Sequence, residues 1–246
     1  MITLNSDAAS TSLSKTTKAI LNEYGIKLNK NLGQNYLIDR NKRDQIIQFG
    51  NLTKDDVVLE IGPGIGTLTI ELAKRVKKVI AIEQDSNICQ ILENRLKKEN
   101  IDNVELINDD ALNVEFPKFD KIISNLPYQI SSPITFKFLN YDFQLAILMY
   151  QKEFASRMNG KVGSKDYSRL SAMLYFKCDV DLLTGVSAES FIPKPKVDST
   201  VVRLTPKLPE LNGQLKHLNI NEINEKDFKT YSKFVKALFQ HRNKKV

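Results

Sequence analysis

Short apolar runs alternate with longer segments of helical periodicity through the middle of the chain. Runs of strand length predict buried strands at residues 57–59, 78–82, 104–107 and 121–124. The residues after the first run, 67–76, have the spacing of a helix. The alternation continues to about residue 202, and it predicts an α/β fold with a mostly parallel sheet and helices on both faces.

The two ends of the chain differ from this pattern. Residues 1–14 are rich in Ser and Thr, which predicts disorder. Helices are expected over 16–24 and over 40–49. After Pro206 the composition becomes that of a linker, and another helix is expected over 225–243.

Composition and charge narrow the class of protein. The chain has 246 residues, enough for one large domain and a small appendage. A net charge of +7 and a pI of about 9.2 fit a partner rich in phosphate. Cys89 and Cys178 lie in apolar contexts and are expected to be buried free thiols. His217 and His241 are isolated, so no metal site is expected.

No membrane span or export signal is expected either. No run is apolar enough to cross a bilayer, and the amino terminus does not combine basic and apolar residues as a secretion signal does. With two unpaired cysteines, these features predict a cytoplasmic protein.

A glycine-rich turn follows the first predicted strand. Gly62, Gly64 and Gly66 lie between that strand and the predicted helix. Alternating glycines let the backbone approach a ligand closely, because no side chain intervenes. Glu83 follows the second predicted strand, where an acidic residue about 20 positions beyond the first glycine can bind ribose hydroxyls. This order of elements predicts a site for a cofactor that contains a nucleoside.

Two nucleoside cofactors compete for this site. NAD sites favour the spacing G-x-G-x-x-G, in which a helix N-terminus faces a pyrophosphate. Here the spacing is G-x-G-x-G, and Glu60 precedes the first glycine by two positions. S-adenosylmethionine has no phosphate, so the spacing and Glu60 favour this methyl donor. Asp110, after the third predicted strand, could accept a hydrogen bond from the adenine amine of the cofactor, and the alternative is a solvated acidic turn.

The tetrapeptide Asn125, Leu126, Pro127 and Tyr128 follows the fourth predicted strand. The N6 amine of adenine is a poor nucleophile, because its lone pair is delocalised into the ring. The side-chain carbonyl of Asn125 and the backbone carbonyl of Leu126 can accept its two N–H groups and help to localise the lone pair. Pro127 stiffens the turn, and Tyr128 offers a ring on which a flipped-out base can stack. A simple strand-ending turn is the alternative, since Asn and Pro are common turn residues.

These candidates share a position in the predicted sheet. Gly62, Glu83, Asp110 and Asn125 each follow the carboxyl end of a predicted strand. Ligands bind at this edge of parallel sheets, so the four residues should converge on one crevice. The hydroxyl of Tyr128 is not asked to transfer a proton, so Tyr128→Phe is expected to keep most of the activity.

Together the motifs resemble the ribosomal RNA adenine N6-dimethyltransferase family. The resemblance covers roughly residues 28–205, and its ordered segments are 31–37, 60–64, 125–133, 148–155, 167–171 and 191–199. Gln129, Ser132 and Pro133 look more like the archaeal and eukaryotic branch than the bacterial one. Tyr36 stands where the family usually has Phe.

The resemblance implies a Rossmann-like class I methyltransferase that uses S-adenosylmethionine. It implies dimethylation of N6 in two adjacent adenosines near the 3′ end of small-subunit rRNA, as part of small-subunit biogenesis. Asn35 and Leu37 would close over the amino-acid end of the donor, and Phe191 would cover the face of the base opposite Tyr128. The implied partner is small-subunit rRNA or the immature small subunit, and the enzyme is expected to act as a monomer.

The resemblance also implies a domain organisation. Residues 1–26 are a partly disordered extension, 27–206 are the methyltransferase domain, and 207–246 are a linker and the start of a helical RNA-binding lobe. This lobe is expected to be shorter than in the family. Lys42 and Arg43 are candidates for contact with RNA phosphates, and the alternative is a solvated basic surface.

Two other functions fit the same residues less well. The erythromycin-resistance type methylates a large-subunit adenosine on the same fold, but its Asn-Ile-Pro-Tyr and its glycine turn differ from those here. A non-catalytic assembly factor could keep the fold and bind the donor as a structural ligand. The complete set of motifs argues against that reading.

Overall fold

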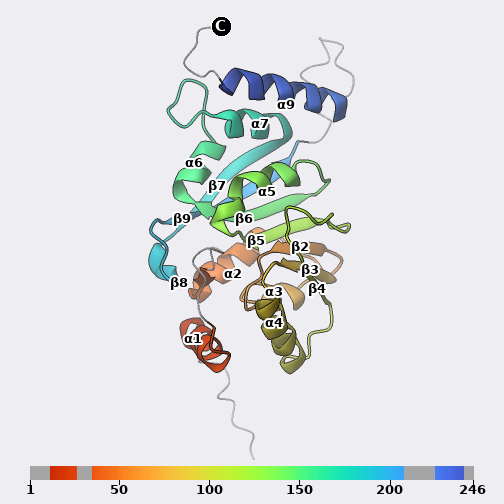
Figure 1. Cartoon of the computed structure of the whole chain (residues 1–246), viewed down its shortest axis with the longest axis vertical. Coiled ribbons are helices and arrows are strands. Elements are labelled where there is room, and N and C mark those ends of the chain that lie inside the picture. The colour runs from red at the N-terminus through yellow and green to blue at the C-terminus, as the bar shows by residue number, and fades with distance from the viewer. Residues whose placement is uncertain (1–11, 27–34, 208–224, 241–246) are drawn as a thin grey trace, which may run out of the picture.

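The computed structural model of the chain describes residues 12–26, 35–207 and 225–240. Its core is a seven-stranded sheet (Figure 1). The strand order is β4-β3-β2-β5-β6-β9-β7. Strands β2 to β6 pair in parallel, whereas β9 is antiparallel to both β6 and β7. These strands are β2 (Val57–Ile61), β3 (Lys78–Glu83), β4 (Val104–Asn108), β5 (Lys121–Asn125), β6 (Leu145–Gln151), β7 (Cys178–Val186) and β9 (Ser199–Pro206).

Two further strands form a separate antiparallel pair beside the sheet. They are β1 (Tyr36–Leu37) and β8 (Phe191–Ile192), with Tyr36 opposite Ile192 and Leu37 opposite Phe191. This pair joins the segment before α2 to the segment before β9. It therefore brings residues from the two ends of the domain to the same side of the main sheet.

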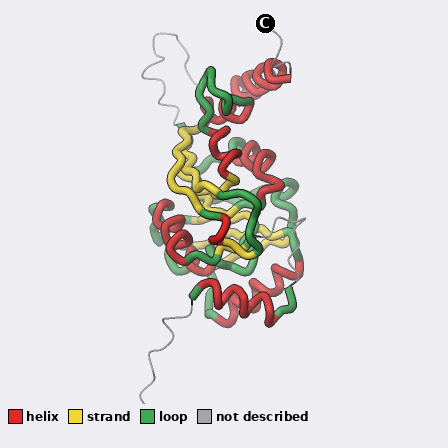
Figure 2. The backbone as a smooth tube through the Cα atoms, turned by 90° about the vertical axis from the view of Figure 1, so that its left-hand side faces the viewer, coloured by secondary structure: helices red, strands yellow, loops and turns green. Residues whose placement is uncertain are grey.

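Helices cover both faces of the sheet (Figure 2). Alternate strand residues enter two different hydrophobic clusters: Leu59 and Leu148 pack with helices α5, α6, α7 and α9, whereas Val58 and Ile147 pack with α2 and α3. The helices are α1 (Leu13–Glu23), α2 (Arg40–Phe49), α3 (Thr69–Ala73), α4 (Ser86–Lys98), α5 (Ser131–Phe138), α6 (Lys152–Met158), α7 (Arg169–Lys177) and α9 (Glu225–Gln240). Short 3-10 turns η3 (Tyr128–Ile130) and η4 (Ala188–Ser190) lie between them.

The predicted mostly parallel sheet is confirmed, and the predicted helix bounds are right in part. The prediction over 40–49 coincides with α2, whose first turn is capped by the Asp39 carboxylate accepting from the Lys42 N–H at 3.1 Å. The prediction over 67–76 was too long at both ends, because α3 begins at Thr69 and ends at Ala73. Residues 64–68 form turns, and the φ of +86° at Gly66 keeps the start of this segment out of a helix.

The predicted disorder over 1–14 was wrong at its end. Leu13 and Ser14 are helical, and the Ser12 hydroxyl caps α1 by accepting from the Lys15 N–H. Residues 1–11 lie outside the described part of the chain. Leu21 of α1 packs in a cluster with Tyr36, so this helix adds to the fold next to β1.

Helix α9 packs on the main body through α7. The ring of Tyr231 stacks on Phe176 with centroids 4.5 Å apart, and its hydroxyl donates to the Ala172 carbonyl at 2.9 Å. The predicted linker and the predicted end of this helix at 241–243 lie outside the described residues, as do His217 and His241.

A buried ion pair holds the amino-terminal edge of the sheet. The Lys121 ammonium donates to the Asp56 carboxylate at 2.9 Å and to the Asn51 carbonyl at 2.8 Å. The same carboxylate oxygen accepts from the Thr53 N–H at 2.6 Å. Burial favours the neutral form of Asp56, but these hydrogen bonds outweigh it and hold its pKa below the usual value. The pair lies at the opposite edge from the strand ends that carry the candidate site.

Candidate active site

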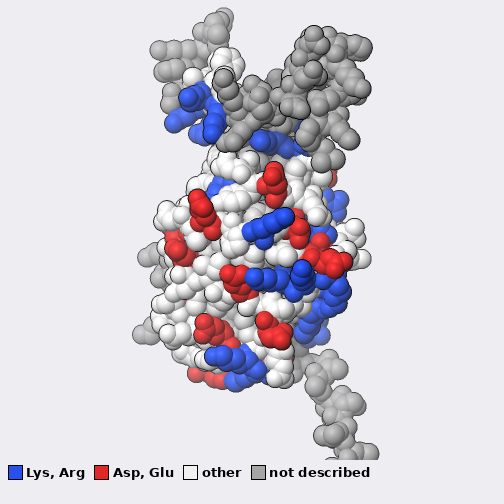
Figure 3. All heavy atoms as spheres, turned by 90° about the vertical axis from the view of Figure 1, so that its right-hand side faces the viewer, with Lys and Arg blue, Asp and Glu red and all other residues white. Residues whose placement is uncertain are grey.

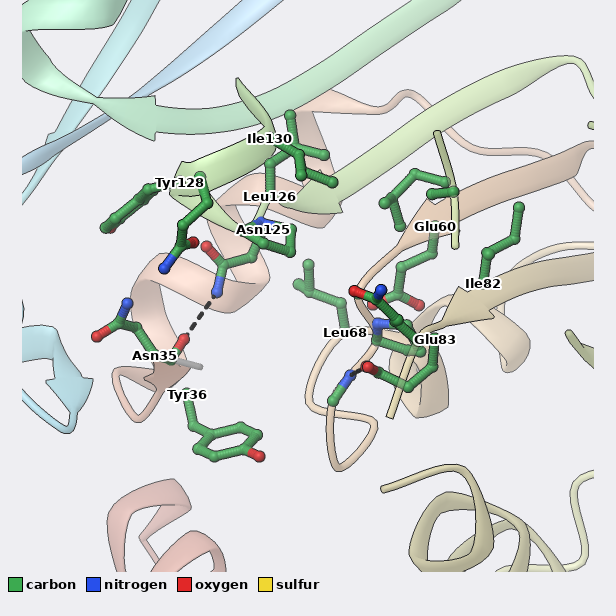
Figure 4. A pocket seen from close by; sticks show the side chains of 18 of the residues that line it. Asn35, Tyr36, Glu60, Leu68, Ile82, Glu83, Asn125, Leu126, Tyr128 and Ile130 are labelled. Carbon is green, nitrogen blue, oxygen red and sulfur yellow. Dashed lines mark hydrogen bonds between the residues drawn. The ribbon is translucent and has the colours of Figure 1, made fainter. Parts of the chain in front are cut away.

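One cavity opens at the carboxyl ends of β2, β3 and β5, with the turn after β4 completing its wall (Figure 4). It brings together the sequence-predicted residues Asn35, Leu37, Gly62, Gly64, Glu83, Asp110, Asn125, Leu126, Pro127 and Tyr128. Residues as far apart in the sequence as Asn35 and Tyr128 thus share one site. The residues after β2, β3, β4 and β5 meet there because parallel strands end at the same edge. The roles of the individual side chains depend on their contacts.

The glycine turn after β2 is tight for two reasons. Gly62 and Gly64 have φ +67° and φ +56°, a region that other residues seldom adopt. A Cβ on Gly64 would also lie 2.8 Å from Cε1 of Tyr36, and a Cβ on Gly62 would lie 3.0 Å from Cγ of Pro127. The turn is therefore packed directly against both β1 and the tetrapeptide.

Glu83 is held at the end of β3 by backbone donors. One carboxylate oxygen accepts from the Gly64 N–H and the other from the Asp85 N–H, each at 3.1 Å. Burial raises the pKa of Glu83. A carboxylate has about four acceptor positions, so about two remain for a ligand.

Glu60 lies deeper in the same wall. Its side chain is 2% exposed, and its Oε2 atom has no hydrogen-bond partner among the described residues. Burial raises the pKa of Glu60 to about 8, and the nearby Glu83 charge adds to this effect. The carboxyl therefore keeps its proton at neutral pH when the site holds no positive charge.

Asp110 is positioned by the turn after β4. Its two carboxylate oxygens accept from the Leu112 N–H and from the Asn113 side-chain amide, each at 2.9 Å. These bonds fix the orientation of the carboxylate at the rim of the cavity. Each oxygen keeps a further acceptor position.

The Asn125 carboxamide has a defined orientation. Its Nδ2 donates to the backbone carbonyl of Asn35 at 3.1 Å (Figure 4). A carbonyl can only accept, so chemistry requires the amide nitrogen on this side and leaves Oδ1 as an acceptor on the other. Just before it, the Ser124 hydroxyl donates to the Ile61 carbonyl at 2.6 Å and ties the end of β5 to β2.

Tyr128 begins the short turn η3 with its ring half-buried at the cavity. Its hydroxyl is hydrogen-bonded to the Ser199 hydroxyl, with the oxygens 2.6 Å apart. Burial raises the pKa of Tyr128, so its hydroxyl stays protonated. The side chain is therefore anchored at its far end.

Phe191 is not among the residues that line the cavity, and its role in covering the base stays a prediction. Phe191 is 2% exposed and packs in the cluster that holds α2 and Leu37. Its strand β8 pairs with β1. Two residues at the site were not predicted from the sequence. Tyr36 backs the glycine turn, and Ser199 holds Tyr128.

Charges on the surface do not form a single patch on the face shown in Figure 3, where basic and acidic side chains are interleaved. Lys42 and Arg43, the candidates for phosphate contact, are both engaged within the protein. The Lys42 ammonium donates to the Thr184 hydroxyl at 3.0 Å, and Arg43 pairs with Asp44 at 2.7 Å. Contact of these two residues with RNA stays a prediction.

Cys89 and Cys178 are free and buried, as predicted. Within residues 12–26, 35–207 and 225–240, no helix has the length and apolar composition needed to cross a membrane. The same residues contain no group of three His, Cys, Asp or Glu side chains that could hold a metal ion.

The sheet, the glycine turn with its acidic strand end, and the Asn-Leu-Pro-Tyr turn define a class of protein: a Rossmann-like methyltransferase. Comparison with known proteins narrows the class further. A family model for ribosomal RNA adenine dimethylase matches residues 25–246. The chain belongs to this ribosomal RNA adenine dimethylase family.

Individual relatives agree with this assignment. A probable ribosomal RNA small subunit methyltransferase A from Methanosphaera stadtmanae is 50% identical over 94% of this chain and 79% of its own length. A crystal structure of a dimethyladenosine transferase from Plasmodium falciparum superposes with a TM-score of 0.73 and 37% identity, over 85% of this chain and 72% of that one. The 23S rRNA methyltransferase ErmE superposes with a TM-score of 0.67 and 29% identity, over 85% and 80% of the two chains.

Proposed function

We propose that this protein dimethylates N6 of two adjacent adenosines near the 3′ end of small-subunit rRNA, with S-adenosylmethionine as the methyl donor. The oriented Asn125 carboxamide carries the proposal, because it presents an acceptor where an amine must be held. Membership of the adenine dimethylase family and the small-subunit relatives support adenine and the small subunit as targets. A cytoplasmic monomer that acts on the immature subunit fits this substrate.

The cavity has groups that fit the donor. Glu83 has acceptor positions left for the two ribose hydroxyls, and Asp110 has acceptor positions for the adenine amine. Gly62 and Gly64 let the backbone pass close to the ligand. The unpartnered Glu60 oxygen lies in the wall where a positively charged ligand group would find a partner. Asn35 and Leu37 line the same cavity and would close over the amino-acid end.

The tetrapeptide would hold the adenine amine that accepts the methyl group. When bound, S-adenosylmethionine supplies the methyl group. Asn125 Oδ1 and the Leu126 carbonyl would accept from the adenine amine, and this directs its lone pair away from the ring. Pro127 packs beside Gly62 and would keep the turn at a fixed distance from the donor. Tyr128 would stack on the base. The amine becomes acidic once methylated, so no strong base is needed and the proton leaves to water.

The test uses purified protein, labelled S-adenosylmethionine and small subunits that lack the modification. We expect dimethyladenosine in the parent, and a loss of about 100-fold or more in Asn125→Ala, as when one positioned polar group is removed from an active site. Asn140→Ala, at an exposed position outside the cavity, is the matched control and should behave as the parent. No dimethyladenosine in the parent would refute the proposed activity.

The likeness to ErmE favours one second candidate, methylation of a large-subunit adenosine. Assaying large and small subunits side by side separates the two. Product on the large subunit alone would replace the small-subunit proposal. A non-catalytic assembly role would instead require that Asn125→Ala supports subunit assembly while the parent yields no methylated product.

A further inference from the structure

Two segments far apart in the sequence meet at the Tyr128 hydroxyl. Tyr128 and Ser199 are 71 positions apart, and their hydroxyl oxygens are 2.6 Å apart. Tyr128 belongs to the turn after β5, whereas Ser199 is the first residue of β9. Tyr128 is among the residues that line the cavity, whereas Ser199 is not.

Ser199 is mounted rigidly. It is 1% exposed and sits between two strands, opposite Gln151 of β6 and Val186 of β7. The residue before it, Asp198, is also fixed: its carboxylate accepts from the Ala188 N–H at 2.9 Å, and its carbonyl accepts from the Lys152 N–H at 3.0 Å. The Ser199 hydroxyl therefore has little freedom to move.

The Tyr128 ring needs such an anchor. Its backbone lies in the one-turn helix η3, and the residue is only half-buried, with its side chain at the cavity. A hydrogen bond at the far end of the ring fixes the direction of the ring axis, and therefore the first side-chain torsion, χ1. The ring is then already in place when a base arrives, and the base does not have to supply the free energy of that ordering.

We propose that Ser199 is a positioning residue for methylation, which holds the Tyr128 ring at the place where the target base stacks. The proposal rests on the proposed function of the tetrapeptide. It changes the expectation for the Tyr128 hydroxyl. That group takes no part in proton transfer, yet its removal by Tyr128→Phe breaks the same hydrogen bond as Ser199→Ala.

The experiment is a double-mutant cycle. We compare the parent, Ser199→Ala, Tyr128→Phe and the double variant by their rates of dimethyladenosine formation on unmodified small subunits. A neutral hydrogen bond predicts a loss of about 2- to 12-fold for each single variant. The double variant should lose no more than either single variant, because all three lack the same bond. The affinity for S-adenosylmethionine, measured by calorimetry, should stay at the parent value.

A matched control separates positioning from general damage to the fold. Ser190→Ala removes another buried serine hydroxyl, which donates to the Asp39 carboxylate at 3.2 Å and does not touch Tyr128. Ser190→Ala should keep the parent rate, and adding it to Tyr128→Phe should leave the rate of Tyr128→Phe unchanged. If Ser199→Ala fails to fold, Tyr128→Phe alone decides, because it breaks the bond from the exposed end; a parent-like rate would then overturn the proposal.

The outcomes distinguish this inference from the proposed function. An inactive parent overturns both. A parent that methylates, with Tyr128→Ala inactive and Ser199→Ala as active as Ser190→Ala, overturns the positioning role alone. Losses in Ser199→Ala and Tyr128→Phe that multiply in the double variant also overturn it, since independent effects would mean that the hydroxyls act separately.

Discussion

Replacing Glu83 with Gln provides a sharp test of the donor site, because the structure accounts for about half of the acceptor positions of its carboxylate. Two of about four positions on the carboxylate are used by the Gly64 and Asp85 N–H groups. A glutamine has one oxygen, and its NH₂ group would face one of these two donors. The variant must therefore leave a backbone N–H unpaired or lose a ribose contact.

The expected magnitude follows from that count. A hydrogen bond to a charged group contributes about 1.5–3 kcal/mol. Losing one should weaken binding of S-adenosylmethionine by roughly 10- to 150-fold, and the amide should not restore what Glu83→Ala removes. Calorimetry on the parent, Glu83→Gln and Glu83→Ala measures this directly. Glu93→Gln is the control, because it makes the same change in charge at an exposed position on α4 outside the cavity.

The pH dependence gives a second readout. Burial raises the pKa of Glu83, and binding of the ribose hydroxyls requires the carboxylate form. Donor affinity of the parent should therefore fall as the pH decreases through that raised pKa, whereas Glu83→Gln should lack this loss. A folded Glu83→Gln protein with the affinity of the parent would refute the assignment of Glu83 to the ribose.

Three further predictions concern the stability of the fold. Gly64→Ala should lower the free energy of unfolding, measured by urea denaturation, more than Gly163→Ala does. Both glycines have positive φ, but a Cβ on Gly64 would lie 2.8 Å from the Tyr36 ring, whereas a Cβ on Gly163 would meet nothing within 4 Å. Equal losses in the two variants would contradict the packing argument. Burial raises the pKa of Glu60 to about 8, so the stability due to its bound proton is fully present below the ordinary carboxyl value and is lost as the pH rises through about 8. Glu60→Gln should remove that dependence between pH 5 and 9 on the scale of about 1 kcal/mol or more, and an unchanged slope would refute it. Lys121→Met removes the charged partner of the buried Asp56 carboxylate and should lower the free energy of unfolding by about 3–5 kcal/mol in urea denaturation. A loss near zero would mean that the carboxylate finds another partner.

The sequence predicted the strands and the crevice well because both depend on local signals. Apolar runs of strand length mark buried strands, and the residue at each strand end needs only the rule that parallel strands share an edge. That rule placed Gly62, Glu83, Asp110 and Asn125 in one cavity. The rule does not predict side-chain direction, so it could not indicate that Phe191 packs in the hydrophobic cluster with Leu37.

The sequence also could not predict contacts between segments that are distant along the chain. Ser199 is a small polar residue in a strand, and nothing in the local pattern indicates that its partner is Tyr128. The helix predicted over 67–76 failed for a related reason, because periodicity reports burial and does not register that the glycine turn extends to Leu68. Both errors arise where tertiary structure overrides the local pattern.

The three-residue stretch formed by Asn35, Tyr36 and Leu37 touches both halves of the site. The Asn35 carbonyl holds Asn125, and the Tyr36 ring lies against Gly64 of the donor turn. A ligand that displaces this stretch at one half of the site would therefore change the contact at the other half. Linkage makes such coupling reciprocal, so bound donor should change the affinity for RNA by the same factor as bound RNA changes the affinity for donor.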